Sequence, residues 1–286
     1  MMEKTKKTLR IRVREGLGNI KRRIIAFLLA PFVYFKKLCF WIGFITFLLF
    51  LALSLSIFLF YHTLPNLKAM DYKDLVQLAR EEVYQRLEDK NKVYKWVSLR
   101  AVNKDLVYAI VMSEDAHFFS HNGINYDALI NSIAENLKRR EFAFGGSTIS
   151  QQVVKNIFLD NKKSIMRKIR ELVITRRMEK RISKNLILEL YLNIAEFGPD
   201  IFGVNAASHY YFKKSAYRIN AAEGAFMALM LPSPRKNHYR LFQNRNLSER
   251  WRRKLQRILK DMLYNDFITE KQYRHYVNYP YFSDKL

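Results

Sequence analysis

The chain has 286 residues, of which 49% are hydrophobic and 14% aromatic, with 50 Lys and Arg against 26 Asp and Glu. This composition excludes a disordered basic tail and provides apolar material for one or two domains. The net charge of +24 favours an anionic partner, such as nucleic acid, a membrane surface, or a phosphorylated or carboxylated substrate. The single Cys39 excludes an intramolecular disulfide framework and a multi-cysteine zinc site.

The N-terminal part of the chain predicts a membrane anchor. A basic arm, residues 1–37, carries 11 Lys and Arg, and the 24 residues that follow, 38–61, contain no charge. A helix of that length rises about 36 Å, enough to cross a hydrocarbon core of about 30 Å. The run is too long for a cleaved signal peptide, and no A-x-A site follows it. We therefore predict a retained transmembrane helix.

The flanks of this helix predict its orientation. Because the basic arm precedes it, the positive-inside rule keeps the N-terminus cytoplasmic and exports residues 62–286. The exported part holds 39 basic and 24 acidic residues and does not meet cytoplasmic nucleic acid. A second apolar run, 24–35, is too short to span and is broken by Pro31, so we expect it to lie in the membrane interface.

Helical patterns dominate the exported part. Residues 72–88 predict a helix that connects the membrane helix to the globular part. Gly and Pro are scarce, at nine and six in the whole chain, and alternating strand patterns are few. Residues 101–270 therefore predict several helices, with loops at 120–127, 142–148, 196–204 and 232–240. The expected organisation is a basic cytoplasmic arm (1–37), a transmembrane helix (38–61), a connecting helix (62–95) and a mainly α extracytoplasmic domain (96–286).

Two adjacent carboxylates, Glu114 and Asp115, follow the apolar run at 106–112 after one serine. They fit an ordinary helix end with satisfied hydrogen bonds. A carboxylate among Val, Ile, Met and Phe would instead have a raised pKa, as a general acid or base requires. The residues alone leave both interpretations open. His117 and His121 have the spacing of a helical zinc pair, but Phe118 stands where a zinc protease has its glutamate, which disfavours that interpretation.

Two further stretches carry candidate ligands for an anion. In 144–156, Thr148 and Gln151 fit a capping box at a helix start, which could be an ordinary cap or an anion site. Residues 155–184 carry 11 basic residues and three acids. The residues that stack on one face of this helix, Lys163, Arg167 and Glu171, fit either a solvated ion pair or, together with Lys155, a site for an anionic leaving group such as pyrophosphate.

Five motifs in order resemble those of the peptidoglycan glycosyltransferase family, in its monofunctional biosynthetic transglycosylase branch. The match covers roughly residues 90–270. The family's E-D-x-x-F-x-x-H-x-G begins at Glu114, and its G-G-S-T-I-T-Q-Q is GGSTISQQ, with Ser150 in place of Thr. The remaining three are RKIRE at 167–171 for R-K-x-K-E, ILELYLN at 187–193 for I-L-E-x-Y-L-N, and 203–212 for G-x-x-x-A-A-x-x-Y-F, shifted by one residue.

The resemblance implies a lysozyme-like, mainly α glycosyltransferase domain. It implies polymerisation of lipid II into β-1,4-linked glycan, with inversion and with release of undecaprenyl pyrophosphate. The enzyme would then be a single-pass protein of the bacterial cytoplasmic (inner) membrane. Its expected partners are lipid II, the growing glycan chain, membrane lipid and other cell-wall synthesis or division proteins, with no nucleic acid.

The motif match also implies the site residues. Glu114 would be the general base that deprotonates the acceptor's 4-hydroxyl, and Glu171 a second catalytic carboxylate near the departing pyrophosphate. The residues implied in substrate binding are Ser147, Gln151, Gln152, Lys155, Lys163 and Arg167. Asp115, His121 and Asn193 are implied to support the site. No tightly bound cofactor is expected, and a divalent cation, Mg²⁺ or Mn²⁺, at Glu171 is left open.

Two other functions stay open beside this one, and a third is disfavoured. A lysozyme-like muramidase or lytic transglycosylase also uses acidic residues in a helical cleft, but it needs no dense cation cluster. A membrane-anchored basic scaffold for anionic wall polymer would need no catalytic carboxylate. A bifunctional penicillin-binding protein is disfavoured, because the S-x-x-K match at Ser233 is followed by neither K-T-G nor S-D-N.

Overall fold

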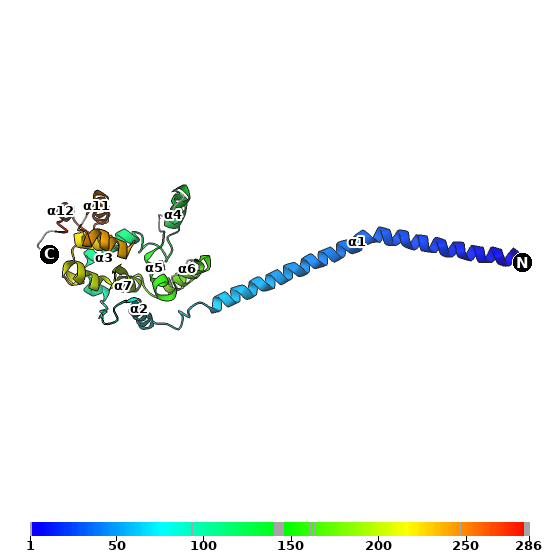
Figure 1. Cartoon of the computed structure of the whole chain (residues 1–286), viewed down its shortest axis with the longest axis horizontal. Helices are drawn as coiled ribbons and strands as arrows, with labels where there is room; N and C mark the ends of the chain where they lie inside the picture. Colours follow the sequence, from blue (N-terminus) through cyan, green and yellow to red (C-terminus); the bar gives the residue numbers. More distant parts are fainter. Residues whose placement is uncertain are drawn as a thin grey trace. The chain divides into compact units, whose positions relative to one another are not determined.

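The computed structural model describes residues 2–92, 94–139, 146–160, 162, 164–245 and 247–282. The chain divides into two compact units, Met1–Leu64 and Pro65–Leu286. Helices dominate throughout the described residues, and the two strands found among them are very short (Figure 1). The predicted mainly α fold class is confirmed.

The first unit contains one long helix, α1 (Met2–His62). Within it, Tyr34–His62 is long and apolar enough to cross a membrane, with a mean hydropathy of 2.6 and no part buried by the protein. The predicted span, 38–61, lies inside this segment. The break expected at Pro31 was wrong, since α1 continues through this residue. A proline removes one backbone hydrogen bond, which a long apolar helix can tolerate.

The second unit is built mainly from helices. Their bounds are α2 (Tyr72–Arg86), α3 (Lys104–Glu114), α4 (Tyr126–Arg139), α5 (Ile149–Phe158), α6 (Ile165–Glu179), α7 (Lys184–Ile194), α8 (Val204–Phe212), α9 (Ala221–Ala228), α10 (Pro234–Asn237), α11 (Glu249–Tyr264) and α12 (Glu270–Tyr276). Short helical turns lie at Leu99–Ala101 (η1), Ala216–Arg218 (η2) and His238–Gln243 (η3). The helix predicted from Tyr72 is present as α2, with Leu75, Ala79 and Val83 buried.

Two of the four predicted loops contain regular structure. The 196–204 segment forms an antiparallel hairpin of β1 (Glu196–Gly198) and β2 (Ile201–Phe202). The loop predicted at 232–240 was wrong, because α10 and η3 occupy it. Pro234 stands in the first turn of α10, where its fixed φ favours a helix and its missing N–H costs nothing. The 142–145 part of the predicted 142–148 loop lies outside the described residues.

The helices of the second unit pack in two groups. Helix α3 packs against α9 and α11, and it buries Leu106, Ala109 and Ile110 completely. Helix α5 packs against α2, α6 and α7. The C-terminal end of α3 meets the N-terminal end of α5, so residues 114–115 and 147–152 come together between the two groups.

Gly203 allows the chain to turn from β2 into α8. Its φ of +79° is in a backbone region that residues with a side chain rarely adopt, and a Cβ there would lie 2.6 Å from the carbonyl oxygen of Asn193. The same turn is held by a 2.8 Å hydrogen bond from the Gly203 N–H to the Ala195 carbonyl. Backbone conformation and space therefore both require glycine.

We expect Gly203→Ala to lower the free energy of unfolding by about 2 kcal/mol, because a strained φ costs about 1–3 kcal/mol. The measurement is urea unfolding of the detergent-solubilised full chain, followed by circular dichroism. Gly43→Ala is the control, since a Cβ at Gly43 has no atom within 4 Å. Equal unfolding midpoints for the two variants would contradict the argument.

Candidate active site

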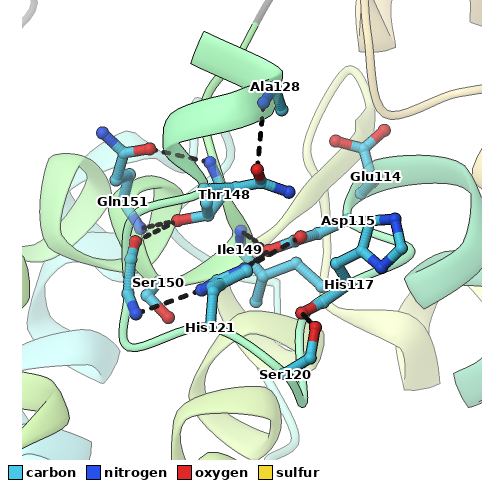
Figure 2. Close-up of polar contacts among 12 residues, drawn as sticks. Glu114, Asp115, His117, Ser120, His121, Ala128, Thr148, Ile149, Ser150 and Gln151 are labelled. Atoms are coloured by element: carbon cyan, nitrogen blue, oxygen red, sulfur yellow. Dashed lines mark hydrogen bonds and ion pairs between the residues drawn. The ribbon is translucent and has the colours of Figure 1, made fainter.

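Asp115 joins the end of α3 to the start of α5. Its carboxylate accepts the Ile149 backbone N–H at 3.1 Å, and the His121 Nε2 lies 3.0 Å from both carboxylate oxygens (Figure 2). The Gly123 N–H donates to His121 Nδ1 at 3.1 Å, so the ring proton is on Nε2 and donates to Asp115. Both ring nitrogens of His121 are thereby engaged, and this histidine is not available as a zinc ligand with His117.

The start of α5 is capped by the protein itself. The hydroxyl of Thr148 accepts the Gln151 N–H at 3.2 Å and donates to the Gly123 carbonyl at 2.7 Å (Figure 2). The Gln151 side chain accepts the Thr148 N–H at 2.9 Å, which completes the predicted capping box. Together with Asp115, these groups accept the N–H groups of Thr148, Ile149 and Gln151 at the start of α5. The ordinary helix cap is therefore the interpretation that the structure supports here.

Glu114 has an amide partner on α5. Gln152 Nε2 donates to Glu114 Oε2 at 2.8 Å, and the Tyr191 hydroxyl contacts Gln152 Oε1 at 3.4 Å, which orients the amide. Burial raises the pKa of Glu114 above its ordinary value. The Gln152 hydrogen bond and the charge of Lys155 oppose this effect, while Asp115 adds to it. Because its pKa is raised, Glu114 can bind a proton at a higher pH than a solvated glutamate does.

Glu171 lies in a different environment, among cations. Its side chain is buried; Oε1 contacts Lys168 Nζ and accepts from Gln151 Nε2 at 3.3 Å. Arg167 Nη1 is 3.6 Å from Oε2. The predicted Arg167–Glu171 pairing is thus present, and Lys168 also reaches Ser147 Oγ at 3.2 Å.

These residues do not fit a divalent cation at Glu171. Both carboxylate oxygens already face cationic or amide donors, and a metal ion requires oxygen or nitrogen ligands with free lone pairs. No group of three or more His, Cys, Asp or Glu that could hold a metal occurs among the residues that the structure describes.

Lys155 projects from α5 beside a pocket of about 490 Å³. The pKa of Lys155 is lowered, first by desolvation in this concave surface. The charge of Glu171 opposes that effect, and the cations nearby, with Arg167 foremost, add to it. The residues that line the pocket include Arg86, Gln152, Asn156, Tyr191, Glu196 and Arg235.

The structure brings most of the predicted site residues together in two clusters. Gln152 lies beside Glu114, and around Glu171 lie Ser147, Gln151 and Arg167. The charge of Lys155 acts on both carboxylates, and Asp115 and His121 lie at the junction of α3 and α5. Asn193 lies apart from both: its amide bonds the Val97 N–H at 2.9 Å and the Val97 carbonyl at 2.8 Å. Lys163 lies outside the described residues.

Sequence reasoning gave no role to Lys168, Tyr191 or Glu179. Lys168 stands three residues before Glu171, and this spacing could have indicated the contact. Tyr191 and Glu179 contact residues that lie far from them in the sequence, and no local pattern predicts such contacts. Glu179 contacts Ser150 Oγ in α5 and pairs with Lys184 Nζ at 2.7 Å, so it ties α5, α6 and α7 together behind the site.

The chain matches the Transglycosylase family over residues 80–263. It is 37% identical over 204 residues to a biosynthetic peptidoglycan transglycosylase from Herminiimonas arsenicoxydans, an alignment covering 70% of this chain and 86% of that protein. A protein of the same name from Janthinobacterium sp. (strain Marseille) is 36% identical with the same coverage. Another from Bordetella avium is 43% identical over 165 residues, covering 55% of this chain and 69% of the relative.

We expect Glu179→Ala to lower the free energy of unfolding by about 3 kcal/mol, because it leaves Lys184 largely buried without its partner. The control is Glu270→Ala, which breaks an exposed pair with Arg274 and costs less than about 0.5 kcal/mol. Denaturant unfolding of both variants and of wild type measures the difference. Similar losses in the two variants would show that the buried network does not stabilise the site.

Proposed function

The chain belongs to the Transglycosylase family, and on this basis we propose that it is a peptidoglycan glycosyltransferase of bacterial cell-wall synthesis. Its substrate is lipid II, which it polymerises into β-1,4-linked glycan while undecaprenyl pyrophosphate leaves. The relatives' printed names support the peptidoglycan assignment, and the site geometry supports the roles of individual residues.

One observation carries the proposal. Two successive residues of α5 bind two different carboxylates, Gln151 binding Glu171 and Gln152 binding Glu114. Burial raises the pKa of Glu114, whereas Glu171 is surrounded by cations. The acceptor substrate must lose a proton, which needs a base such as Glu114. The donor substrate must lose an anion, which needs cations such as those around Glu171, so the reaction needs both environments side by side.

Glu114 is the general base of the proposed reaction. Its Oε2 is held by Gln152, and Oε1 has no hydrogen-bond partner among the described residues, so it can accept the proton. As the 4-hydroxyl of one lipid II gives this proton to Glu114, its oxygen attacks the anomeric carbon of the other substrate. The bond from that carbon to the pyrophosphate oxygen breaks, and its electron pair leaves with undecaprenyl pyrophosphate. A single displacement of this kind inverts the anomeric centre.

The cations around Glu171 stabilise the leaving group. Lys155, Arg167 and Lys168 gather near this carboxylate, and fixed positive charge lowers the free energy of a departing pyrophosphate. The resemblance also implies Lys163, which lies outside the described residues, in binding this leaving group. Glu171 holds Arg167 and Lys168 in position through its ion pairs. A hydrolase of finished glycan has no anionic leaving group and no need of this cluster.

The membrane helix places the enzyme at its substrate. The apolar segment Tyr34–His62 is long enough for a single-pass anchor. The 11 Lys and Arg among residues 1–37 keep the N-terminus cytoplasmic, so the catalytic domain works at the outer face of the cytoplasmic membrane. A substrate with a polyprenyl tail stays at that surface, together with the other cell-wall synthesis and division proteins that the enzyme meets there.

We expect Glu114→Gln to lower the rate of glycan synthesis by about 10²–10⁴-fold, the range typical of a lost general base. Purified full-length protein is incubated with lipid II in detergent, and the products are separated by size. The control is Glu81→Gln, in the exposed Gln77–Glu81 hydrogen bond of α2. A folded Glu114→Gln protein with more than a few per cent of wild-type activity would refute the assignment. Fragments from finished glycan, without polymer from lipid II, would instead establish a hydrolase.

The hydrogen bond from Gln152 predicts a pH effect. It stabilises the ionised form of Glu114 and so lowers the pKa of this group, and Gln152→Ala removes that effect. Because the base must be ionised, we expect the acid limb of kcat/KM to move to higher pH. Gln77→Ala, which removes the matching exposed bond to Glu81, should leave the limb in place. An unshifted limb in Gln152→Ala would show that Glu114 does not control it.

A further inference from the structure

Helix α11 carries a row of cations on its exposed side. Its five members, which we call the α11 basic face, are Arg250, Arg253, Lys254, Arg257 and Lys260. Apart from the adjacent Arg253 and Lys254, they recur every three or four residues, so they share one side of the helix over about 15 Å. None of the five has an ion-pair partner among the residues that the structure describes.

The cations of this face repel one another. Arg250 and Lys254, and likewise Arg253 and Arg257, stand four residues apart, a spacing at which like charges destabilise a helix. The pKa of Lys254 is lowered, mainly by desolvation and then by the charge of Arg250. Glu249 and Asp261 are the acidic residues of α11, and six Lys and Arg outnumber them. In α12, by contrast, Arg274 pairs with Glu270. An anion bound along α11 would relieve this repulsion.

The opposite side of α11 determines which anion fits. Its apolar residues, Leu255, Ile258, Leu259 and Met262, are buried, and the helix packs on α3 and α9. An interfacial helix inserts its apolar side into lipid while its cations contact the headgroups. Helix α11 has no such side left to insert. Its basic face therefore fits a soluble chain of acidic groups better than a lipid surface.

The position of α11 connects this face to the catalytic helix. At its end, Asn265 Nδ2 lies 3.6 Å from Met112 Sδ, two residues before Glu114. Shortly after it, Phe267 stacks on Tyr108 of α3 with ring centroids 3.7 Å apart. Figure 1 shows α11 and α12 at one end of the second unit and α4 and α6 toward its other end.

We propose that the α11 basic face binds the acidic stem peptides of nascent or mature glycan strands. The inference rests on the proposed function, which makes such a strand the product of this enzyme. A row of cations can contact carboxylates on successive peptides of one strand. Binding of this kind would hold the strand on the same group of helices that carries Glu114.

The test is co-sedimentation of the full-length protein, in non-ionic detergent, with insoluble bacterial cell wall. One wall preparation keeps its stem peptides and a second has them removed by an amidase. The variant Arg253→Gln/Arg257→Gln/Lys260→Gln is compared with Lys73→Gln/Lys95→Gln/Arg218→Gln, which removes the same charge from exposed positions elsewhere. We expect the α11 variant to bind peptide-bearing wall about ten-fold more weakly, and the control variant to bind as wild type does.

Three results would overturn the proposal: no loss of wall binding in the α11 variant, equal losses in the two variants, or equal binding of wild type to the peptide-bearing and the peptide-free wall. Wall binding by the α11 variant should also fall with salt less steeply than that of wild type. Unfolding midpoints verify that both variants fold. Lipid II polymerisation, measured in parallel, distinguishes a failure of the α11 proposal from a failure of the proposed function. If wild type binds peptide-bearing wall but makes no polymer, only the proposed polymerase function is refuted.

Discussion

The hydrogen bonds of Asp115 are the contacts on which the rest of the site depends. This carboxylate accepts the Ile149 N–H, a contact between residues 34 positions apart, and it pairs with His121. It thereby fixes the C-terminal end of α3 against the first turn of α5. Glu114 is the neighbouring residue, so its position opposite Gln152 follows from the position of Asp115. A shift of either helix end would separate Glu114 from its amide partner.

Helix α5 then keeps the two proposed catalytic carboxylates in different surroundings. Successive residues of an α-helix point about 100° apart, so Gln151 and Gln152 reach in different directions. Gln151 binds the carboxylate that pairs with Arg167 and Lys168, and Gln152 binds Glu114. Lys155 follows four residues after Gln151 and so extends from the same side. One capped helix therefore binds both the proposed base, Glu114, and the carboxylate that the cations surround, Glu171.

The sequence could predict those parts of the site that follow from short spacing. The Thr148–Gln151 capping box and the Arg167–Glu171 pair both arise within one turn of helix, and both are present. The contacts of Ser150 with Glu179 and of Tyr191 with Gln152 join residues 29 and 39 positions apart. Such contacts depend on how helices pack, so no periodicity indicates them.

The same limit explains the errors in the fold. The 232–240 segment looked like a loop because of its prolines and serine, although Pro234 in fact starts a helix. Pro31 lies inside α1 although proline usually interrupts a helix. Proline has different effects at the two places. In the first turn of α10 it favours the helix, and inside α1 the surrounding apolar helix tolerates it.

The net charge of +24 indicated an anionic partner but not its shape. The structure divides the cations into two arrangements. Around Glu171, Arg167 and Lys168 converge on one point, which suits a compact anion with several oxygens. Along α11 the cations extend in a row, which suits a chain with spaced carboxylates. Because a leaving pyrophosphate is compact and a peptide-bearing glycan is extended, the spacing of the cations, more than their number, distinguishes the proposed donor site from the proposed product-binding surface.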